Sequence, residues 1–174
     1  MKKGIIIALS CIAIMFAACK KPVEPTPVDP TPVDYTTNYV GNYLGQFTLT
    51  VVSMNDQAQS NLELPVDSIR MDIAKGAEIN TITTTVRVEN EAYQTTGTTT
   101  EEKIDFGTIP FVIDKPDQMY MFDLELKLEG TKAVNDSLNI IGTFTGNGNF
   151  TWPTGDVIQL DEVSGTVSGK LGKQ

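Results

Sequence analysis

The sequence contains no histidine and only two cysteines, Cys11 and Cys19. Histidine is the side chain best suited to proton transfer near neutral pH, and it is the commonest nitrogen ligand of zinc and copper. Two cysteines are too few for a zinc ribbon, and without histidine no thiol–imidazole pair can form. These absences argue against an enzyme, and the sequence predicts no metal site and no cofactor.

Basic residues are also scarce, with 13 Lys and Arg against 22 Asp and Glu. Proteins gain affinity for nucleic acids by neutralising phosphates with Lys and Arg, so this balance predicts no nucleic-acid partner. Paired carboxylates could still support hydrolysis. The candidates are Asp114, Asp117, Asp123, Glu125, Glu101 and Glu102. We interpret them as solvated residues of turns and outer strand faces.

No apolar run is long enough to span a bilayer comfortably. The longest, Gly4–Phe16, follows Lys2 and Lys3 and precedes the small residues Ala17 and Ala18. A short cationic start, an apolar core of this length and small residues after it are typical of a signal peptide.

The end of this segment, Phe16-Ala17-Ala18-Cys19, resembles the lipobox of bacterial lipoproteins. The resemblance implies cleavage before Cys19 and acylation of Cys19, for example with palmitate. Several acyl chains anchor a protein stably to a membrane. It also implies a lipid-anchored protein of the cell envelope, favouring the outer membrane, with the periplasmic or surface face left open. The alternative is a secreted protein cut by ordinary signal peptidase, with Cys19 as a free thiol.

Residues 22–34 form a proline-rich repeat, PVEPTPVDPTPVD. Proline fixes φ and lacks an amide donor, so an extended polyproline II spacer is expected rather than a helix or a central strand. The spacer is either a stalk, which we favour, or a ligand for a proline-recognising domain. The predicted organisation is a signal peptide at 1–18, a lipidated N-terminus and linker at 19–35, and one domain at 36–174.

From about Thr36 onward, apolar and polar residues alternate with a period of two. The clearest run is Tyr120–Glu129, in which Tyr120, Phe122 and Leu124 alternate with charged or polar residues. Such alternation predicts antiparallel strands with one buried and one solvated face. Gly107 and Pro110 make Ile104–Ile113 a bulged or edge strand. Residues 57–67 are ambiguous and could hold a short helical turn.

This pattern predicts an all-β fold, an antiparallel up-and-down barrel of about eight strands, with a β-sandwich as the alternative. The stretch Val40–Thr50, with Tyr43 between glycines, resembles the first strand of the calycin-like (lipocalin-like) lipoproteins of Bacteroidetes. Classical lipocalins have tryptophan at the position of Tyr43. The resemblance implies a barrel, and Tyr43 is expected to be a core residue that closes it.

Two groups of residues are candidates for contact or modification. Tyr93, Phe150 and Trp152 are aromatic residues expected to form a contact surface or to plug one end of the barrel. Asp67-Ser68-Ile69 and Asp136-Ser137-Leu138 resemble acceptor sites of Bacteroidetes O-glycosylation, which makes Ser68 and Ser137 possible sites.

The predicted function is that of a lipid-anchored, non-catalytic envelope protein whose barrel binds a small apolar or saccharide ligand. The alternative is a structural or interaction subunit of an envelope assembly, with an envelope protein as its partner and no ligand of its own. An open interior would favour the first function and a filled interior the second.

Overall fold

The computed structural model describes residues 31–115, 119–151 and 154–174, and for residues 59–61 it describes the backbone alone. A compact unit covers Pro32–Gln174. Among the described residues, no helix is both long enough and apolar enough to cross a membrane. The unit contains eight strands: β1 Gly41–Met54, β2 Gln57–Lys75, β3 Thr81–Val88, β4 Glu91–Thr99, β5 Lys103–Lys115, β6 Tyr120–Lys132, β7 Leu138–Thr151 and β8 Val157–Lys173.

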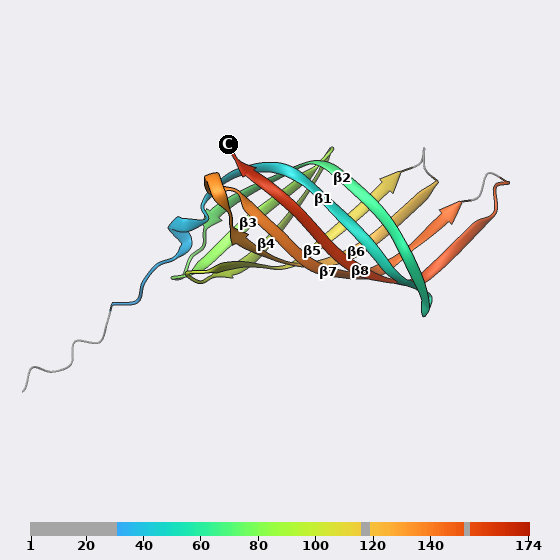
Figure 1. The fold of residues 1–174 in the computed structure, drawn as a ribbon, viewed down its shortest axis with the longest axis horizontal. Coiled ribbons are helices and arrows are strands. Elements are labelled where there is room, and N and C mark those ends of the chain that lie inside the picture. Colours follow the sequence, from blue (N-terminus) through green and yellow to red (C-terminus); the bar gives the residue numbers. More distant parts are fainter. Residues whose placement is uncertain (1–30, 116–118, 152–153) are drawn as a thin grey trace, which may run out of the picture. The chain divides into compact units, whose positions relative to one another are not determined.

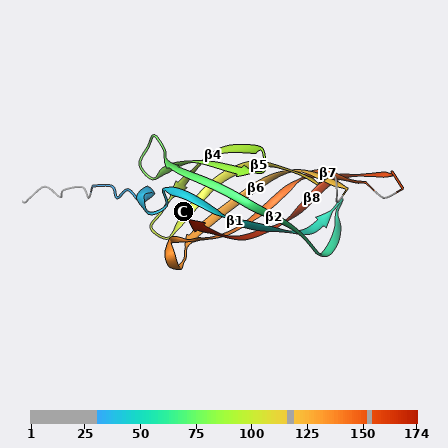
Figure 2. The ribbon, with the colours of Figure 1, turned by 90° about the horizontal axis from the view of Figure 1, so that it is seen from above.

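The eight strands form a closed barrel in chain order, and β1 pairs with β8 to complete the ring. Every neighbouring pair is antiparallel, so the molecule is an all-β, up-and-down barrel. The predicted barrel is therefore confirmed, and the sandwich alternative is wrong because the sheet closes on itself. Figures 1 and 2 show the short 3₁₀ helix η1 (Thr36–Asn38) and the C-terminus at one end, which we call the η1 end.

The predicted alternation fixes which side chains enter the barrel. In β6, residues from Tyr120 to Leu128 alternate strictly between buried and exposed, as the sequence indicates. Tyr120, Phe122 and Leu124 point inward, whereas Asp123 and Glu125 lie on the outer face. These two carboxylates are therefore solvated, as expected from their position in the alternation.

The helical turn considered for residues 57–67 is wrong, because these residues begin the long strand β2. Asn55 and Asp56 both have positive φ, 46° and 60°, and form a tight turn that brings Gln57 opposite Met54. Pro65 is tolerated in this strand because β2 pairs with β3 only from Arg70 onward. The missing amide of Pro65 therefore interrupts no ladder on that side.

The η1 end is closed by the segment that precedes β1. Tyr39 is fully buried, and Tyr43 is 1% exposed. The hydroxyl of Tyr43 donates to the carbonyl of Tyr39 at 2.8 Å, which confirms Tyr43 as a core residue. The chain is tied to the same end before η1, since Asn80 donates to Val33 O at 3.0 Å and accepts from Tyr35 N at 2.7 Å. These contacts start within the predicted linker, at Val33.

Burial at this end should make tyrosine ionisation part of alkaline unfolding. Burial, with smaller effects of Asp136 and Tyr39, raises the pKa of Tyr43 from 10.0 to about 12. The folded state thus prefers the neutral phenol, so its contribution to stability is complete below about pH 10 and is lost as the pH rises toward 12. Phenolate absorbance should still be increasing above about pH 11. Tyr43→Phe should reduce this late increase, to which Tyr39 and Tyr120 also contribute because burial raises the pKa of each. Completion of all ionisation near pH 10 in the folded protein would contradict the prediction.

Phenylalanine side chains fill the interior by lying over glycines of the neighbouring strand. Phe47 lies opposite Gly169, Phe122 opposite Gly148 and Phe144 opposite Gly165. A Cβ at these glycines would lie 2.5–2.6 Å from an atom of the facing ring, so the rings occupy the space that side chains would need. This arrangement packs aromatic rings against backbone across three pairs of strands.

The described interior has no room for a water-filled cavity. A cavity would leave accessible area on the side chains around it, yet seven large aromatic side chains of the interior are at most 1% exposed, and Tyr120 is only 7% exposed. The seven are Tyr39, Tyr43, Phe47, Phe106, Phe111, Phe122 and Phe144. The barrel is a packed core and not a container of the lipocalin kind.

One hydroxyl in this core has no partner. Thr84 in β3 is fully buried, and its Oγ1 makes no hydrogen bond with any described residue. An unsatisfied buried hydroxyl costs about 1–3 kcal/mol. Thr84→Val, which replaces the hydroxyl by a methyl group of similar size, should raise the free energy of unfolding by about 1 kcal/mol in urea denaturation.

A matched control for this substitution is Thr36→Val. Thr36 is also fully buried, but its Oγ1 donates to Asp34 at 2.6 Å, so its replacement should destabilise the fold. Equal losses of stability in both variants would show that the hydroxyl of Thr84 is satisfied in solution.

Candidate functional site

The shortest ladder of the barrel joins β4 and β5. Only two residue pairs join these strands, Thr98 with Asp105 and Thr99 with Ile104. Beyond them, residues 91–97 of β4 and 108–115 of β5 have no ladder pairing with each other, whereas β3 pairs with β4 along its full length. We call this unpaired stretch the seam.

Three local features of β5 and β4 explain why the ladder stops there. The register of β5 shifts between Asp105 and Thr108, where Gly107 adopts a φ of 69°. The hydroxyl of Thr95 lies 2.9 Å from Phe106 O and 3.0 Å from Thr108 O, and so takes the place of a backbone donor from β4. Pro110 has no amide to donate. Of the two predicted alternatives for Ile104–Ile113, the bulge is confirmed, whereas β5 is not an edge strand because it pairs with β4 as well as β6 in a closed barrel.

A cleft of about 560 Å³ occupies the seam. Its described lining comes from β2, the end of β3, the β3–β4 turn, β4 and β5: Val66, Val88, Glu89, Asn90, Glu91, Tyr93, Phe111, Val112, Ile113, Asp114 and Lys115. Val66, Phe111 and Ile113 form a buried floor, while Val88 and Tyr93 are half-buried and Val112 is 41% exposed. The cleft thus offers an apolar surface under a polar rim, and its volume suits a small ligand.

Tyr93 is the central side chain of this seam cleft. Its ring packs against Phe111 with a centroid distance of 5.5 Å and an interplanar angle of 48°. Its hydroxyl accepts a hydrogen bond from the amide of Val112 at 3.2 Å, so Tyr93 spans the seam from β4 to β5. Because that hydroxyl acts as the acceptor, its own proton can still be donated to a ligand.

The rim of the cleft is acidic. Lys115 Nζ pairs with Glu89 Oε1 at 2.5 Å, and this contact raises the pKa of Lys115 above its ordinary value. Within the described residues, the carboxylates of Glu91 and Asp114 have no ion-pair partner. The only cation of the described lining is therefore already neutralised, and two carboxylates remain.

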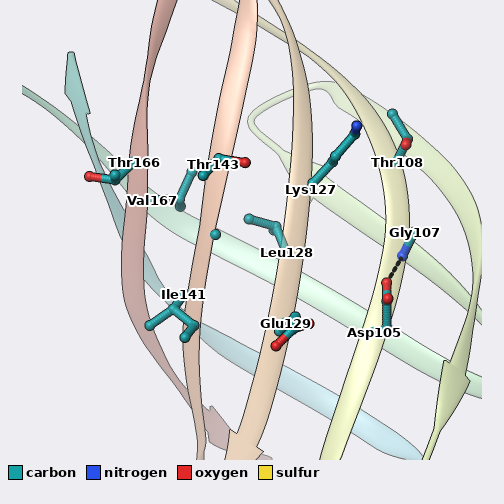
Figure 3. A pocket seen from close by; sticks show the side chains of 11 residues that line it. Asp105, Gly107, Thr108, Lys127, Leu128, Glu129, Ile141, Thr143, Thr166 and Val167 are labelled. Atoms are coloured by element: carbon teal, nitrogen blue, oxygen red, sulfur yellow. Dashed lines mark hydrogen bonds between the residues drawn. The ribbon is translucent and has the colours of Figure 1, made fainter. Parts of the chain in front are cut away.

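A second hollow lies on the outer face of the barrel and is larger, about 770 Å³ (Figure 3). We call it the outer groove. Figure 3 shows Thr166, Thr143, Lys127 and Thr108 in a row across β8, β7, β6 and β5, which matches their register. Its described lining contains no aromatic side chain.

Two of the three charged side chains of the outer groove have partners in the protein, whereas Lys127 has no ion-pair partner among the described residues. Asp105 accepts from the amide of Gly107 at 2.8 Å, and Glu129 pairs with Lys103 at 2.7 Å. The contact with Glu129 raises the pKa of Lys103. We therefore interpret the outer groove as a solvated sheet surface and the smaller seam cleft as the better candidate site.

The three predicted contact aromatics do not form one surface in the described structure. Tyr93 lies in the seam cleft. Phe150, opposite Tyr120 in β6, is partly buried and packs against the core. Trp152 lies outside the described residues, as does Cys19, the predicted lipidation site.

The two predicted glycosylation sites differ in exposure. Ser68 is exposed, with a φ of 57°, where the β1–β2 register is interrupted. Ser137 is only 5% exposed, and its hydroxyl donates to Val134 O at 2.8 Å. Of the two, only Ser68 presents its hydroxyl to solvent. Among the described residues there is also no cluster of three or more side chains suited to a metal ion.

No family model matches this sequence, and no curated protein matches it. Among solved structures, a protein of unknown function from the DUF3598 family of Nostoc punctiforme is similar, with 11% identity and a TM-score of 0.35. The similarity covers 86% of this chain and 52% of that protein, so this chain spans about half of its length.

Sequence reasoning did not identify most residues of the seam cleft. Tyr93 was selected for its aromatic ring alone, whereas Val88, Phe111 and Lys115 had no distinguishing signal. The one relevant signal was the predicted bulge or edge in β5, carried by Gly107 and Pro110. It predicts a weak junction but does not reveal which strand lies on the other side.

Proposed function

We propose that this protein is a lipid-anchored, non-catalytic protein of a bacterial envelope whose barrel binds a small apolar ligand in the seam cleft. The observation that supports this best is the coincidence of an apolar cleft with the shortest ladder of the barrel. Ladder pairing in a closed barrel satisfies the hydrogen-bonding groups of the backbone. Where the ladder stops over several residues, these groups need another partner, from the protein itself or from a ligand. The resemblance to calycin-like lipoproteins of Bacteroidetes is in keeping with this role.

Because the interior of the barrel is packed, the seam is the more accessible place for a ligand. A ligand inside the barrel would have to displace rings such as Phe47 and Phe144, which are at most 1% exposed. At the seam, Val88, Tyr93 and Val112 are already accessible. A saccharide would favour an aromatic face, which the outer groove lacks and which Tyr93 alone offers in the cleft.

The position of the linker favours access to the cleft. The chain is attached at the η1 end through Asp34, which pairs with Lys75, and through Asn80. Glu89 and Asn90 belong to the β3–β4 turn, at the other end of those strands. The described end of the linker is therefore attached at the end of the barrel away from this turn.

Binding of octanol, measured by calorimetry, tests this proposal with two matched variants. Val112→Trp adds bulk to the seam cleft, and Ile141→Trp adds the same bulk to the outer groove; both residues are exposed, 41% and 59%. We expect Val112→Trp to weaken binding about tenfold, a difference of about 1.4 kcal/mol, and Ile141→Trp to leave it unchanged. Equal affinity in all three proteins, or no binding by the native protein, would refute the seam cleft as the site.

A second candidate is an interaction subunit without a ligand of its own. It is favoured by the packed interior and by the strand edges at the seam, since an extended segment of a partner can pair with such edges. A photo-crosslinking residue at position 112 should then give one defined protein adduct in intact cells, and the same residue at position 141 should not. Adducts of equal yield from both positions would argue against a specific partner at the seam.

A further inference from the structure

We infer that the seam cleft selects a ligand that carries a cationic group beside its apolar part. This inference rests on the proposed function, because it concerns the ligand of the same cleft. It follows from the charges and the aromatic rings around the cleft. The proposed function, in contrast, rests only on the size and the apolar lining of the cleft.

The first support is the uncompensated negative charge of the rim. Lys115 is held by Glu89, which leaves Glu91 and Asp114 without a cationic partner among the described residues. Both carboxylates are exposed at the edge of an apolar surface. Each carboxylate would attract a cation bound beside it and would repel an anion.

The second support is an arrangement found at two of the four other tyrosines of this chain. The ammonium of Lys132 lies 5.9 Å from the ring centroid of Tyr39, and that of Lys173 lies 5.9 Å from that of Tyr43. Such distances are typical of cation–π attraction. Tyr93 has no comparable cation among the described residues, although its ring is half-buried in an acidic setting. A cationic group of the ligand would take that place.

An anionic ligand finds little support in the same cleft. The amide of Val112 already donates to Tyr93, and the ammonium of Lys115 already donates to Glu89. An anion would have to compete with Glu89 for Lys115 while lying near Glu91 and Asp114. A neutral apolar ligand meets neither obstacle, so affinity should fall in the order cation, neutral molecule, anion.

Three probes with the same octyl chain separate these cases: octyltrimethylammonium, octanol and octanoate. Calorimetry at low ionic strength should show octyltrimethylammonium binding about five- to tenfold more tightly than octanol, and octanoate more weakly than octanol. Added salt should reduce the advantage of the cation, because exposed charges are screened. Equal affinity for the cation and octanol would overturn the inference and leave the proposed function standing. Failure of all three probes to bind would overturn both.

Two double variants locate the attraction, and each removes two exposed carboxylates. Glu91→Gln with Asp114→Asn neutralises the rim of the cleft, whereas Glu101→Gln with Glu102→Gln neutralises the β4–β5 turn at the η1 end. The first should abolish the advantage of octyltrimethylammonium over octanol, and the second should preserve it. Equal loss in both would show that the acidic protein attracts cations generally, and would overturn the inference.

Discussion

Replacing Gly165 by alanine is expected to lower the free energy of unfolding by about 2–3 kcal/mol. Gly165 lies in β8 between Val51 and Phe144, and its missing side chain leaves room for the phenylalanine ring. A Cβ at this position would collide with the carbonyl oxygen of Thr50 and lie 2.5 Å from Cζ of Phe144. Neither the backbone nor the ring, which is 1% exposed, can move without disturbing the packed interior.

Gly172→Ala is the matched control, because Gly172 lies in the same strand and faces open space. Its nearest atom would be Leu44 O, 3.8 Å from an added Cβ. This variant should be as stable as the native protein, or more stable by a few tenths of a kcal/mol, because alanine restricts the unfolded chain. Urea denaturation of the two variants compares them directly. A Gly165→Ala protein as stable as Gly172→Ala would mean that the interior has space that the structure does not show.

Replacing Cys19 by alanine is expected to move the protein from the membrane fraction to the soluble fraction. The lipobox resemblance makes Cys19 the attachment site, and acyl chains there would be the anchor. In a bacterial host, the native chain should incorporate labelled palmitate, and Cys19→Ala should incorporate none. The difference should be nearly complete in both readouts, because the acyl chains are the proposed anchor.

Cys11→Ala controls for the loss of a cysteine as such. Cys11 lies within the predicted signal peptide, so this variant should keep both the label and the membrane location. Absence of palmitate from the native chain would contradict lipidation and favour the secreted alternative with a free Cys19.

The strands of this barrel could be predicted from sequence because their pattern is local. Inward-pointing residues contact the core and outward-pointing residues contact water. The alternation of apolar and polar residues along β6 or β8 therefore indicates on which face of the sheet each side chain lies. The tight turn at Asn55-Asp56 is equally local, because Asn and Asp tolerate the positive φ that it requires. The same alternation does not distinguish a closed barrel from a sandwich, because both have one buried face. Closure depends on the pairing of β1 with β8, which no local pattern encodes.

The candidate site was less predictable for the same physical reason. The seam exists because the β4–β5 ladder does not extend beyond the pair Thr98–Asp105, owing to a bulge at Gly107, a side-chain hydrogen bond from Thr95 and the missing amide of Pro110. Gly107 and Pro110 indicate a bulged or edge strand. Thr95, however, is one of many threonines, and nothing in the sequence distinguishes it from the others. The packing of phenylalanines over glycines was also hidden, because it joins residues far apart in the chain.

The central claim is that ligand binding takes place at the seam and leaves the packed interior unchanged. Methyl NMR of the native protein during titration with octanol tests it most directly. The account predicts shifts of Val88, Val112 and Ile113, with the interior methyl groups of Leu49, Leu126 and Leu171 unmoved. Shifts of the interior methyl groups without those of the seam would contradict it, because they would place the ligand inside the barrel.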